Sequence, residues 1–220
     1  MSFCLKKAIV IVIAIALVAC TTDVYESGDG DYSYIRGDFA NLSTDSHGRI
    51  VSFLTDDNAT IKLPSPVAVE GMKADTTYRA LVYYNQPQNA APELLNLKMV
   101  SVAKAFEESD DDPLKTDPVG WESMWVSSNG TYLNLALNLL DGVSDDKDDP
   151  LHHVLGVCLN STANHHFYFT LYHDQSGIPE YYTRKAYFSM PLDDTFQKND
   201  TLTLTVNTYD GIQTKTVILP

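Results

Sequence analysis

The histidines of this sequence are the side chains whose type could most directly bind a metal ion. Five of the six lie in its last third, at His152, His153, His165, His166 and His173. Adjacent residues of a β-strand point to opposite faces, so each His-His doublet offers one ligand per face rather than two together. His165 and His173 share the parity of Phe167, Phe169 and Leu171, and are the metal candidates. No Cys or carboxylate stands at the short spacing of common zinc sites, so we expect hydrogen-bonded histidines at strand ends, no metal and no cofactor.

Two further motifs could carry chemistry, and each lacks part of its pattern. The acidic segment 141–149 could collect Ca²⁺ ligands, but Val143 stands in its third position and no glycine in its sixth, unlike an EF-hand loop. Ser101 and Lys104 have the spacing of the nucleophile motif of penicillin-recognising enzymes, whose other motifs are absent. We therefore expect a protein that is not an enzyme. The rival hypothesis is a hydrolase with an unfamiliar site, which convergent carboxyl groups of raised pKa would favour.

Four aromatic residues are the candidates for a ligand or partner surface. Trp121 and Trp125 flank Ser123, and alternate positions of a strand share one face, so we expect the two indole rings on the same side. Tyr181 and Tyr182 follow a Gly-Ile-Pro segment in a predicted loop, where we expect exposure. Aromatic planes stack on sugar rings or pack against proteins, so the expected ligand is a protein, peptide or glycan. The competing interpretation is that one tryptophan fills a core.

Cys20 is a candidate for covalent modification by lipid. Lys6 and Lys7 precede an unbroken apolar run, residues 8–19, that ends at Cys20 in the order of a lipoprotein signal peptide. Twelve residues of helix rise only about 18 Å, which is too short for the roughly 30 Å hydrocarbon core of a membrane. We expect residues 1–19 to be a signal peptide and residues 20–31 a lipidated flexible tether. The mature protein would be anchored by Cys20 in the cell envelope, at the outer membrane, with its folded part in the periplasm or exposed on the cell surface.

The charge of the chain excludes polyanionic partners. Its formal net charge is −14, and removal of the signal peptide takes away two lysines and no acidic residue. Nucleic acid binding depends on Lys and Arg that displace counterions, and no basic stripe is present, so we expect no nucleic acid partner. The negative charge fits a cationic partner better, or it simply keeps the protein soluble. Cys158, the one cysteine outside the signal peptide and the lipid site, is expected to be a small buried hydrophobe.

The elements that position these residues are predicted to be β-strands. The clearest alternation of apolar and polar residues covers Leu133–Leu139, with one face expected in a core and the other in water. Leu202–Val206 repeats the pattern with threonines on the polar face. Further predicted strands cover 50–54, 59–63, 78–84, 94–103, 121–126, 151–159, 166–172, 184–190 and 213–219.

An acidic, proline-bearing stretch divides these strands into two groups. Glu107, Glu108 and three aspartates precede Pro113 and Pro118 and break the alternation, so we predict a linker at residues 107–118. Residues 32–106 then form a domain of about five strands, as in a small closed or partly open barrel. Residues 119–220 form a domain of about seven, as in a two-sheet β-sandwich.

Several short strings, in their order along the chain, resemble the NigD-like lipoproteins of Bacteroidota. They are Asp29-Gly30-Asp31-Tyr32-Ser33 at the first strand, Leu54-Thr55-Asp56-Asp57-Asn58 at a hairpin, Tyr172-His173-Asp174, Arg184-Lys185 leading to Phe188-Ser189-Met190-Pro191-Leu192, and Tyr209-Asp210-Gly211 at the last hairpin. Asn58 departs from the glycine that such a hairpin would more readily carry. The resemblance covers essentially the whole mature chain. It implies an all-β fold, with an OB-like N-terminal barrel followed by an immunoglobulin-like C-terminal sandwich.

The resemblance implies little about function. The family takes its name from a protein linked to a bacteriocin locus and proposed as an immunity factor, and it supplies no catalytic residues for this sequence. Our first hypothesis is a non-catalytic envelope lipoprotein that acts as a binding or accessory module. The second is immunity against an antibacterial peptide, which the negative charge would suit if that peptide is cationic.

Overall fold

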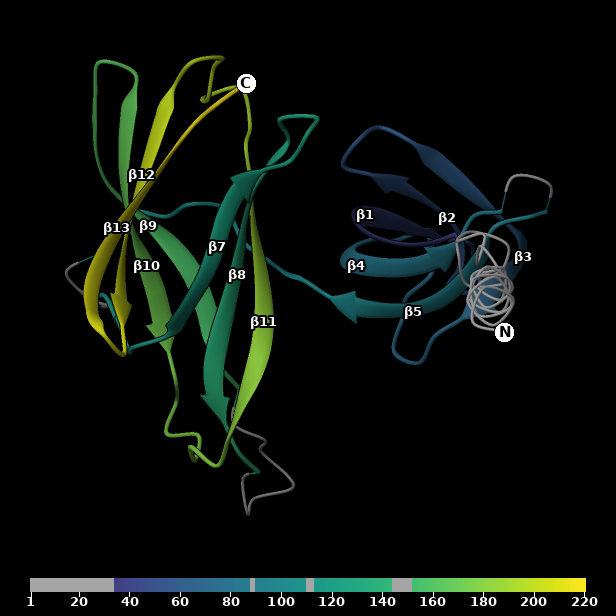
Figure 1. Ribbon diagram of the computed structural model, residues 1–220, viewed down its shortest axis with the longest axis horizontal. Helices are drawn as coiled ribbons and strands as arrows, with labels where there is room; N and C mark the ends of the chain where they lie inside the picture. Colours follow the sequence, from purple (N-terminus) through teal and green to yellow (C-terminus); the bar gives the residue numbers. More distant parts are fainter. Residues whose placement is uncertain (1–33, 88–89, 110–112, 144–151) are drawn as a thin grey trace, which may run out of the picture. The chain divides into compact units, whose positions relative to one another are not determined.

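The computed structural model describes residues 34–87, 90–109, 113–143 and 152–220, and every regular element in these ranges is a β-strand (Figure 1). Residues 35–220 form one compact unit. The predicted all-β fold is confirmed, with a curled half-barrel sheet followed by a β-sandwich of two sheets. The described residues include no helix that is long and apolar enough to cross a membrane.

The N-terminal sheet has five antiparallel strands in the order β3-β2-β1-β4-β5. Their bounds are β1 (Ile35–Thr44), β2 (Arg49–Thr55), β3 (Thr60–Ala68), β4 (Thr77–Asn85) and β5 (Glu93–Met99). The sheet curls around a small core of Ala40, Leu42, Ile50, Phe53, Ile61, Ala80, Val82 and Tyr84. β3 and β5 are the two outer strands of this sheet and are not hydrogen-bonded to each other, which leaves a half-barrel.

Strand β1 lies at the centre of this sheet, although the alternation of apolar residues did not predict it. Only three of its side chains are buried, Ala40, Leu42 and Thr44, and of these only Leu42 is large and apolar. Arg36 and Asp38 stand on the same strand and form an ion pair of 3.0 Å. These two charged residues make the sequence of the strand resemble that of a polar loop. The string at residues 29–33, where the resemblance implied the first strand, lies outside the described residues.

The C-terminal sandwich consists of two four-stranded sheets, β13-β12-β10-β9 and β6-β11-β8-β7. The strand bounds are β6 (Ser101–Val102), β7 (Gly120–Val126), β8 (Tyr132–Asp141), β9 (Val154–Ala163), β10 (His166–Asp174), β11 (Tyr182–Pro191), β12 (Thr201–Thr208) and β13 (Gly211–Ile218). β10 and β12 pair in parallel, as do the short β6 and β11, and the other pairs are antiparallel.

Strand β8 supplies the centre of the sandwich core. Leu133, Leu135, Leu137 and Leu139 are at most 1% exposed and pack against Phe188 and the other core side chains. Burial of a leucine side chain contributes about 1.5–3 kcal/mol relative to exposure. The expectation that the opposite face of β8 is wet was wrong for Asn134 and Ala136, which are 0% and 3% exposed. Asn134 is hydrogen-bonded to Arg79 of the half-barrel, which covers this face.

The chain enters the sandwich well before β7. Ser101 and Val102 pair with β11, and Phe106 forms a parallel bridge with Cys158 on β9. Within the predicted linker, Thr116 forms a parallel bridge with His173, and Val119 bridges Thr208 immediately after it. The described residues of 107–118 therefore run along the sheet that contains β9, β10 and β12.

Candidate functional site

The two tryptophans do not form one surface. A β-bulge between Trp121 and Ser123 shifts the register of β7, so that Trp121 pairs with Leu137 and Trp125 with Asn134. Trp121 packs against the sandwich core, whereas the Trp125 ring lies 5.2 Å from the Phe39 ring of the half-barrel. The prediction that both indoles share a face was wrong, because a bulge adds one residue and reverses the alternation beyond it.

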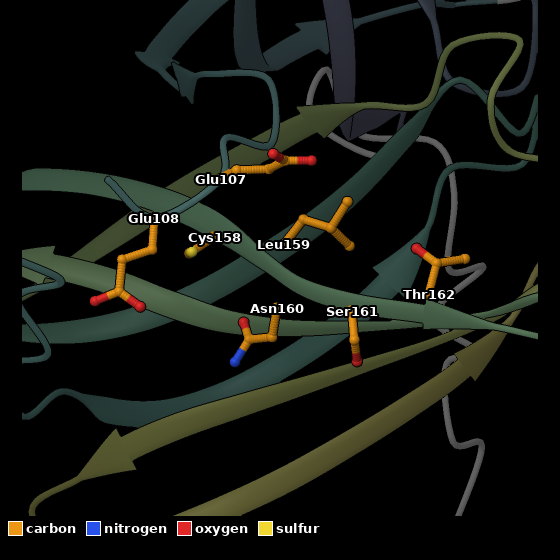
Figure 2. Close-up of a pocket in the computed structure, with 7 residues that line it drawn as sticks. All are labelled: Glu107, Glu108, Cys158, Leu159, Asn160, Ser161 and Thr162. Carbon is orange, nitrogen blue, oxygen red and sulfur yellow. The ribbon is translucent and has the colours of Figure 1, made fainter. Parts of the chain in front are cut away.

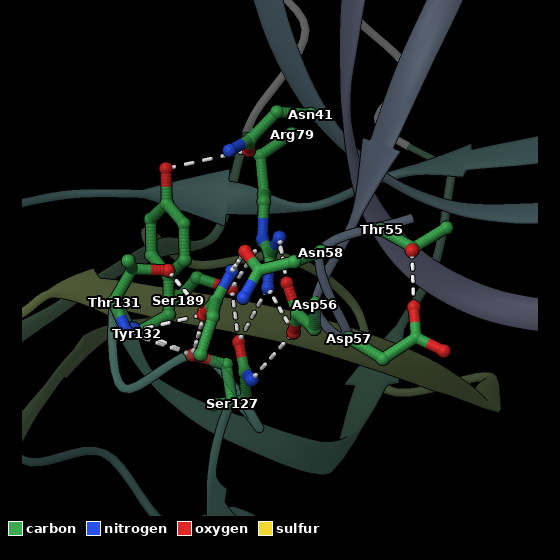
Figure 3. A network of polar contacts seen from close by, with 12 residues as sticks. Asn41, Thr55, Asp56, Asp57, Asn58, Arg79, Ser127, Thr131, Tyr132 and Ser189 are labelled. Carbon is green, nitrogen blue, oxygen red and sulfur yellow. Dashed lines mark hydrogen bonds and ion pairs between the residues drawn. The ribbon is translucent and has the colours of Figure 1, made fainter. Parts of the chain in front are cut away.

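Arg79 of β4 lies at the centre of the contact between the half-barrel and the sandwich (Figure 3). Its side chain is 2% exposed and its two terminal nitrogens donate to the Asp56 carboxylate at 2.6 and 2.7 Å. It also donates to Asn134 Oδ1 at 3.2 Å, and its guanidinium stacks 4.0 Å from the Tyr132 ring centroid. This cation is fully paired, so it stabilises the contact and offers no binding capacity.

The exposed aromatic side chains at one end of the sandwich are Tyr181, Tyr182 and Tyr209, which we call the tyrosine surface. They are 76%, 50% and 43% exposed. All three attach to the end of β8. The Tyr181 amide donates to the Asp141 carbonyl at 2.9 Å, Tyr182 pairs with Asp141, and the Tyr209 hydroxyl accepts from the Leu140 amide at 3.3 Å. The sequence predicted the first two in an exposed loop: both are exposed, but the loop placement was wrong for Tyr182, which is the first residue of β11. Tyr209, in a hairpin far along the chain, was not predicted.

A compact loop holds Tyr181 in place. The Ile178 amide donates to the Gln175 carbonyl at 3.1 Å, and the Gln175 side chain donates to the Ile178 carbonyl and to Glu180 at 3.1 and 2.9 Å. Ile178 is 4% exposed. Gly142 lies directly against this loop, where any side chain would collide with the Pro179 carbonyl oxygen. The tyrosines are therefore displayed on ordered backbone.

Carboxylates flank the tyrosine surface. Glu180 precedes Tyr181 and Asp210 follows Tyr209, and among the described residues neither forms an ion pair. Burial acts to raise the pKa of the Asp141 carboxyl below them, but the hydrogen bonds from Arg184 and from the Gly142 amide together lower it. The surface therefore combines aromatic area with negative charge.

The histidine metal candidates are not brought together. His165 Nδ1 lies 2.9 Å from Asp200 Oδ1, with the imidazole 76% exposed. His173 is fully buried at the other end of β10, beside His153. No group of three or more metal-ligating side chains occurs within the described ranges. Most of the acidic segment 141–149 lies outside them.

A polar pocket of about 480 Å³ lies beside β9 (Figure 2). It is lined by Glu107, Glu108, Cys158, Leu159, Asn160, Ser161 and Thr162. Cys158 is 2% exposed, and burial raises the pKa of its thiol. A neutral buried thiol is a poor nucleophile.

Several described carboxyl groups have pKa values shifted downward. The backbone amide and side chain of Arg49 lower the pKa of Asp45 to about 2. The pKa values of Asp57, Asp174 and Asp193 are also lowered, mainly by hydrogen bonds from neighbouring groups. A general acid needs the opposite shift, so these carboxylates do not supply one.

Comparison with known proteins identifies the family to which this architecture belongs. The family model of the NigD-like C-terminal β-sandwich domain matches residues 101–219. A search of curated proteins gave no match. A NigD-like immunity protein from Bacteroides caccae is 23% identical with a TM-score of 0.59, and the match covers 83% of this chain and 91% of that one.

Two further solved structures share the fold. A protein of unknown function from Bacteroides vulgatus is 18% identical with a TM-score of 0.65, and the match covers 84% of this chain and 91% of that one. A candidate lipoprotein from Bacteroides fragilis is 9% identical with a TM-score of 0.59, covering 84% and 98%. At these identities the likeness shows the fold alone.

Proposed function

Because the chain belongs to the NigD-like family, we propose that it is a non-catalytic, lipid-anchored binding module of the cell envelope, with the tyrosine surface as its recognition site for a cationic protein or peptide. The observation that carries this proposal is the exposure of Tyr181, Tyr182 and Tyr209 together on one ordered end of the sandwich. Tyrosine is enriched in the central contacts of protein interfaces.

The charge distribution supports a cationic partner. Glu180 and Asp210 stand next to the exposed rings, and the chain carries a formal net charge of −14. Complementary charge steers association and raises its rate, especially at low salt. A cationic peptide would contact the rings through its apolar or methylene groups and the carboxylates through its Lys or Arg side chains.

The proposal of a lipid anchor is based on the sequence. Residues 17–20 end the apolar run in the pattern of a lipoprotein cleavage site, and the B. fragilis protein of similar fold is described as a candidate lipoprotein. Acyl chains on Cys20 would hold the protein at the membrane and leave the tyrosine surface free to bind a soluble partner.

A screen of immobilised ligands tests the proposed class of partner. The lipidated protein in detergent is applied to cationic peptides, to the same peptides with Glu in place of Lys and Arg, and to neutral glycans. We expect binding to the cationic peptides that weakens as salt rises. Equal binding to the anionic peptides, or binding confined to glycans, would refute the proposal.

Immunity against an antibacterial peptide is a second candidate function, favoured by the B. caccae structure, which is described as a NigD-like immunity protein. It is a special case of the same binding. Deletion of the gene should then raise sensitivity to an antibacterial peptide made by related strains, and the wild-type gene should restore resistance. Unchanged sensitivity to all such peptides would exclude immunity and leave the binding role standing.

A further inference from the structure

Two buried histidines form a hydrogen-bonded pair beneath the tyrosine surface. His153 Nδ1 lies 2.9 Å from His173 Nε2, and the rings stack with centroids 5.2 Å apart and 16° between their planes. His173 is 0% exposed, and the His153 side chain is 2% exposed. Buried imidazoles with this contact must share protons in a defined way.

The neighbouring groups fix the protonation of both rings. His173 Nδ1 lies 3.0 Å from the Asp117 carbonyl oxygen, which only accepts, so Nδ1 carries the hydrogen. His173 Nε2 is then an acceptor, and His153 Nδ1 donates to it. His153 Nε2 is left without a hydrogen. It is buried and has no hydrogen-bond partner within the described part of the chain, and Asp141 Oδ1 lies 3.9 Å away.

The pair secures a short segment, Lys115–Val119, which we call the strap. The His173 amide donates to the Lys115 carbonyl, and the Asp117 amide donates to the His173 carbonyl, both at 3.0 Å. The Asp117 carboxylate accepts from the Gln175 amide at 2.8 Å. Further along the strap, Val119 pairs with the end of β12. His173 therefore holds the strap by side chain and backbone together.

Charged groups from four segments face the pair. Asp141 and Arg184, bound to each other, come from β8 and β11 and face His153. Asp117 of the strap and Asp174 of β10 face His173, and Lys115 neutralises Asp174 at 2.6 Å. Burial lowers the pKa of both histidines, and the neighbouring imidazole lowers that of His153 further.

We propose that His153 and His173 form a proton-sensitive latch that holds the strap while both rings are neutral and releases it in mildly acidic solution. The first proton goes to His153 Nε2, which turns that ring into a cation facing Asp141 and keeps its bond to His173. A second proton on His173 Nε2 would place two N–H groups opposite each other at 2.9 Å, so the pair must separate.

The latch also reaches the tyrosine surface. The Asp141 carboxylate faces the His153 ring that takes the first proton. The backbone of the same residue accepts a hydrogen bond from the Tyr181 amide and pairs with Tyr182. Proton uptake that moves Asp141 therefore moves the backbone that displays both rings. This part of the inference rests on the proposed function, whereas the latch itself does not.

The sign of the pH dependence follows from the lowered pKa values. The unfolded chain, with histidines at their ordinary value of 6.5, binds protons more readily than the folded one. The latch therefore contributes its full stability above pH 6.5 and loses it as the pH falls through 6.5 toward the folded values. Each unit by which a pKa is lowered makes a tenfold difference to the folding equilibrium.

Hydrogen exchange on the wild-type lipoprotein in detergent tests the latch without any partner. After correction for the intrinsic pH dependence of exchange, we expect amides of the strap and of Tyr181 to lose protection at least about tenfold between pH 7.5 and pH 5.5. Amides in the middle of β8 should keep their protection from exchange. Unchanged protection of the strap would overturn the proposal.

Variants separate this pair from the other histidines. Asn can donate where His153 Nδ1 and His173 Nδ1 donate but does not titrate, so the double variant His153→Asn/His173→Asn should lose most of the fall in melting temperature on acidification. The exposed control His165→Asn should behave like wild type. An equal fall in melting temperature in all three proteins would contradict the latch. If the double variant does not fold, the exchange experiment on the wild-type protein still tests the proposal. A working latch with no peptide binding would instead contradict the proposed function.

Discussion

Arg79 shows how one side chain can join the half-barrel sheet to the β-sandwich. A guanidinium that is 2% exposed must have its donors satisfied, and Asp56 and Asn134 do so from the half-barrel and the sandwich. Breaking a buried ion pair is costly because the remaining charge stays in a poorly solvated site.

We therefore expect Arg79→Met to lower the free energy of unfolding by about 3 kcal/mol, because Asp56 then keeps a largely buried charge without its partner. The matched control is Arg49→Met, which removes an exposed ion pair with Asp45 and should cost less than about 1 kcal/mol. Urea unfolding followed by tryptophan fluorescence measures both. Equal losses would mean that the buried Arg79 contact stabilises the fold no more than the exposed Arg49 ion pair.

Sequence alone could not have identified this contact. Arg79 stands in an apolar strand, Tyr78–Tyr84, and its partners Asp56 and Asn134 are 23 and 55 positions away. Nothing in the local pattern indicates which polar residue is paired through space. Tyr181 and Tyr182 were more predictable, because a loop with Gly and Pro between two alternating segments indicates exposure.

At the scale of elements, alternation of apolar residues predicted most of the strands. It failed in β1, where Leu42 is the one large apolar side chain at the three buried positions, and on the second face of β8, which the half-barrel covers. The bulge in β7 reversed the expected orientation of one tryptophan, and the sequence carries no marker for it.

A prediction at this scale concerns the loop before β11. Gly142→Ala should lower stability by up to about 3 kcal/mol, because the new methyl group meets the Pro179 backbone, and should expose the Tyr181 amide to exchange. Gly177→Ala is the control: its surroundings are open, so only the left-handed backbone, with φ of 72°, is penalised, by roughly 1 kcal/mol. Normal protection of Tyr181 in Gly142→Ala would show that this contact does not position the loop.

At the scale of the whole molecule, the apolar run at residues 8–19 and Cys20 predict a lipidated protein. Metabolic labelling with an alkyne-bearing palmitate should tag the wild-type protein and not Cys20→Ser. Cys4→Ser, which changes a cysteine within the signal peptide, should be labelled like wild type. Label that persists in Cys20→Ser would place the acyl group elsewhere.

The family and the all-β fold, with a half-barrel sheet followed by a β-sandwich, could also be inferred from the sequence, because the predicted strands and the short strings that resemble the family lie along most of the chain. The tyrosine surface could be inferred only in part. Tyr209 joins Tyr181 through a contact with Leu140, which lies 69 positions away, and only the fold brings them together.

The most direct test of the central claim is the affinity of the lipidated protein for a cationic peptide selected in the screen, measured by calorimetry for wild type and for Tyr181→Ala/Tyr182→Ala. We predict a loss of about 2 kcal/mol, roughly thirtyfold in Kd, because both rings are central to the contact. Tyr83→Ala, which removes a 38% exposed ring on the half-barrel, should bind like wild type. Unchanged affinity in the double variant, or an equal loss in Tyr83→Ala, would contradict the claim.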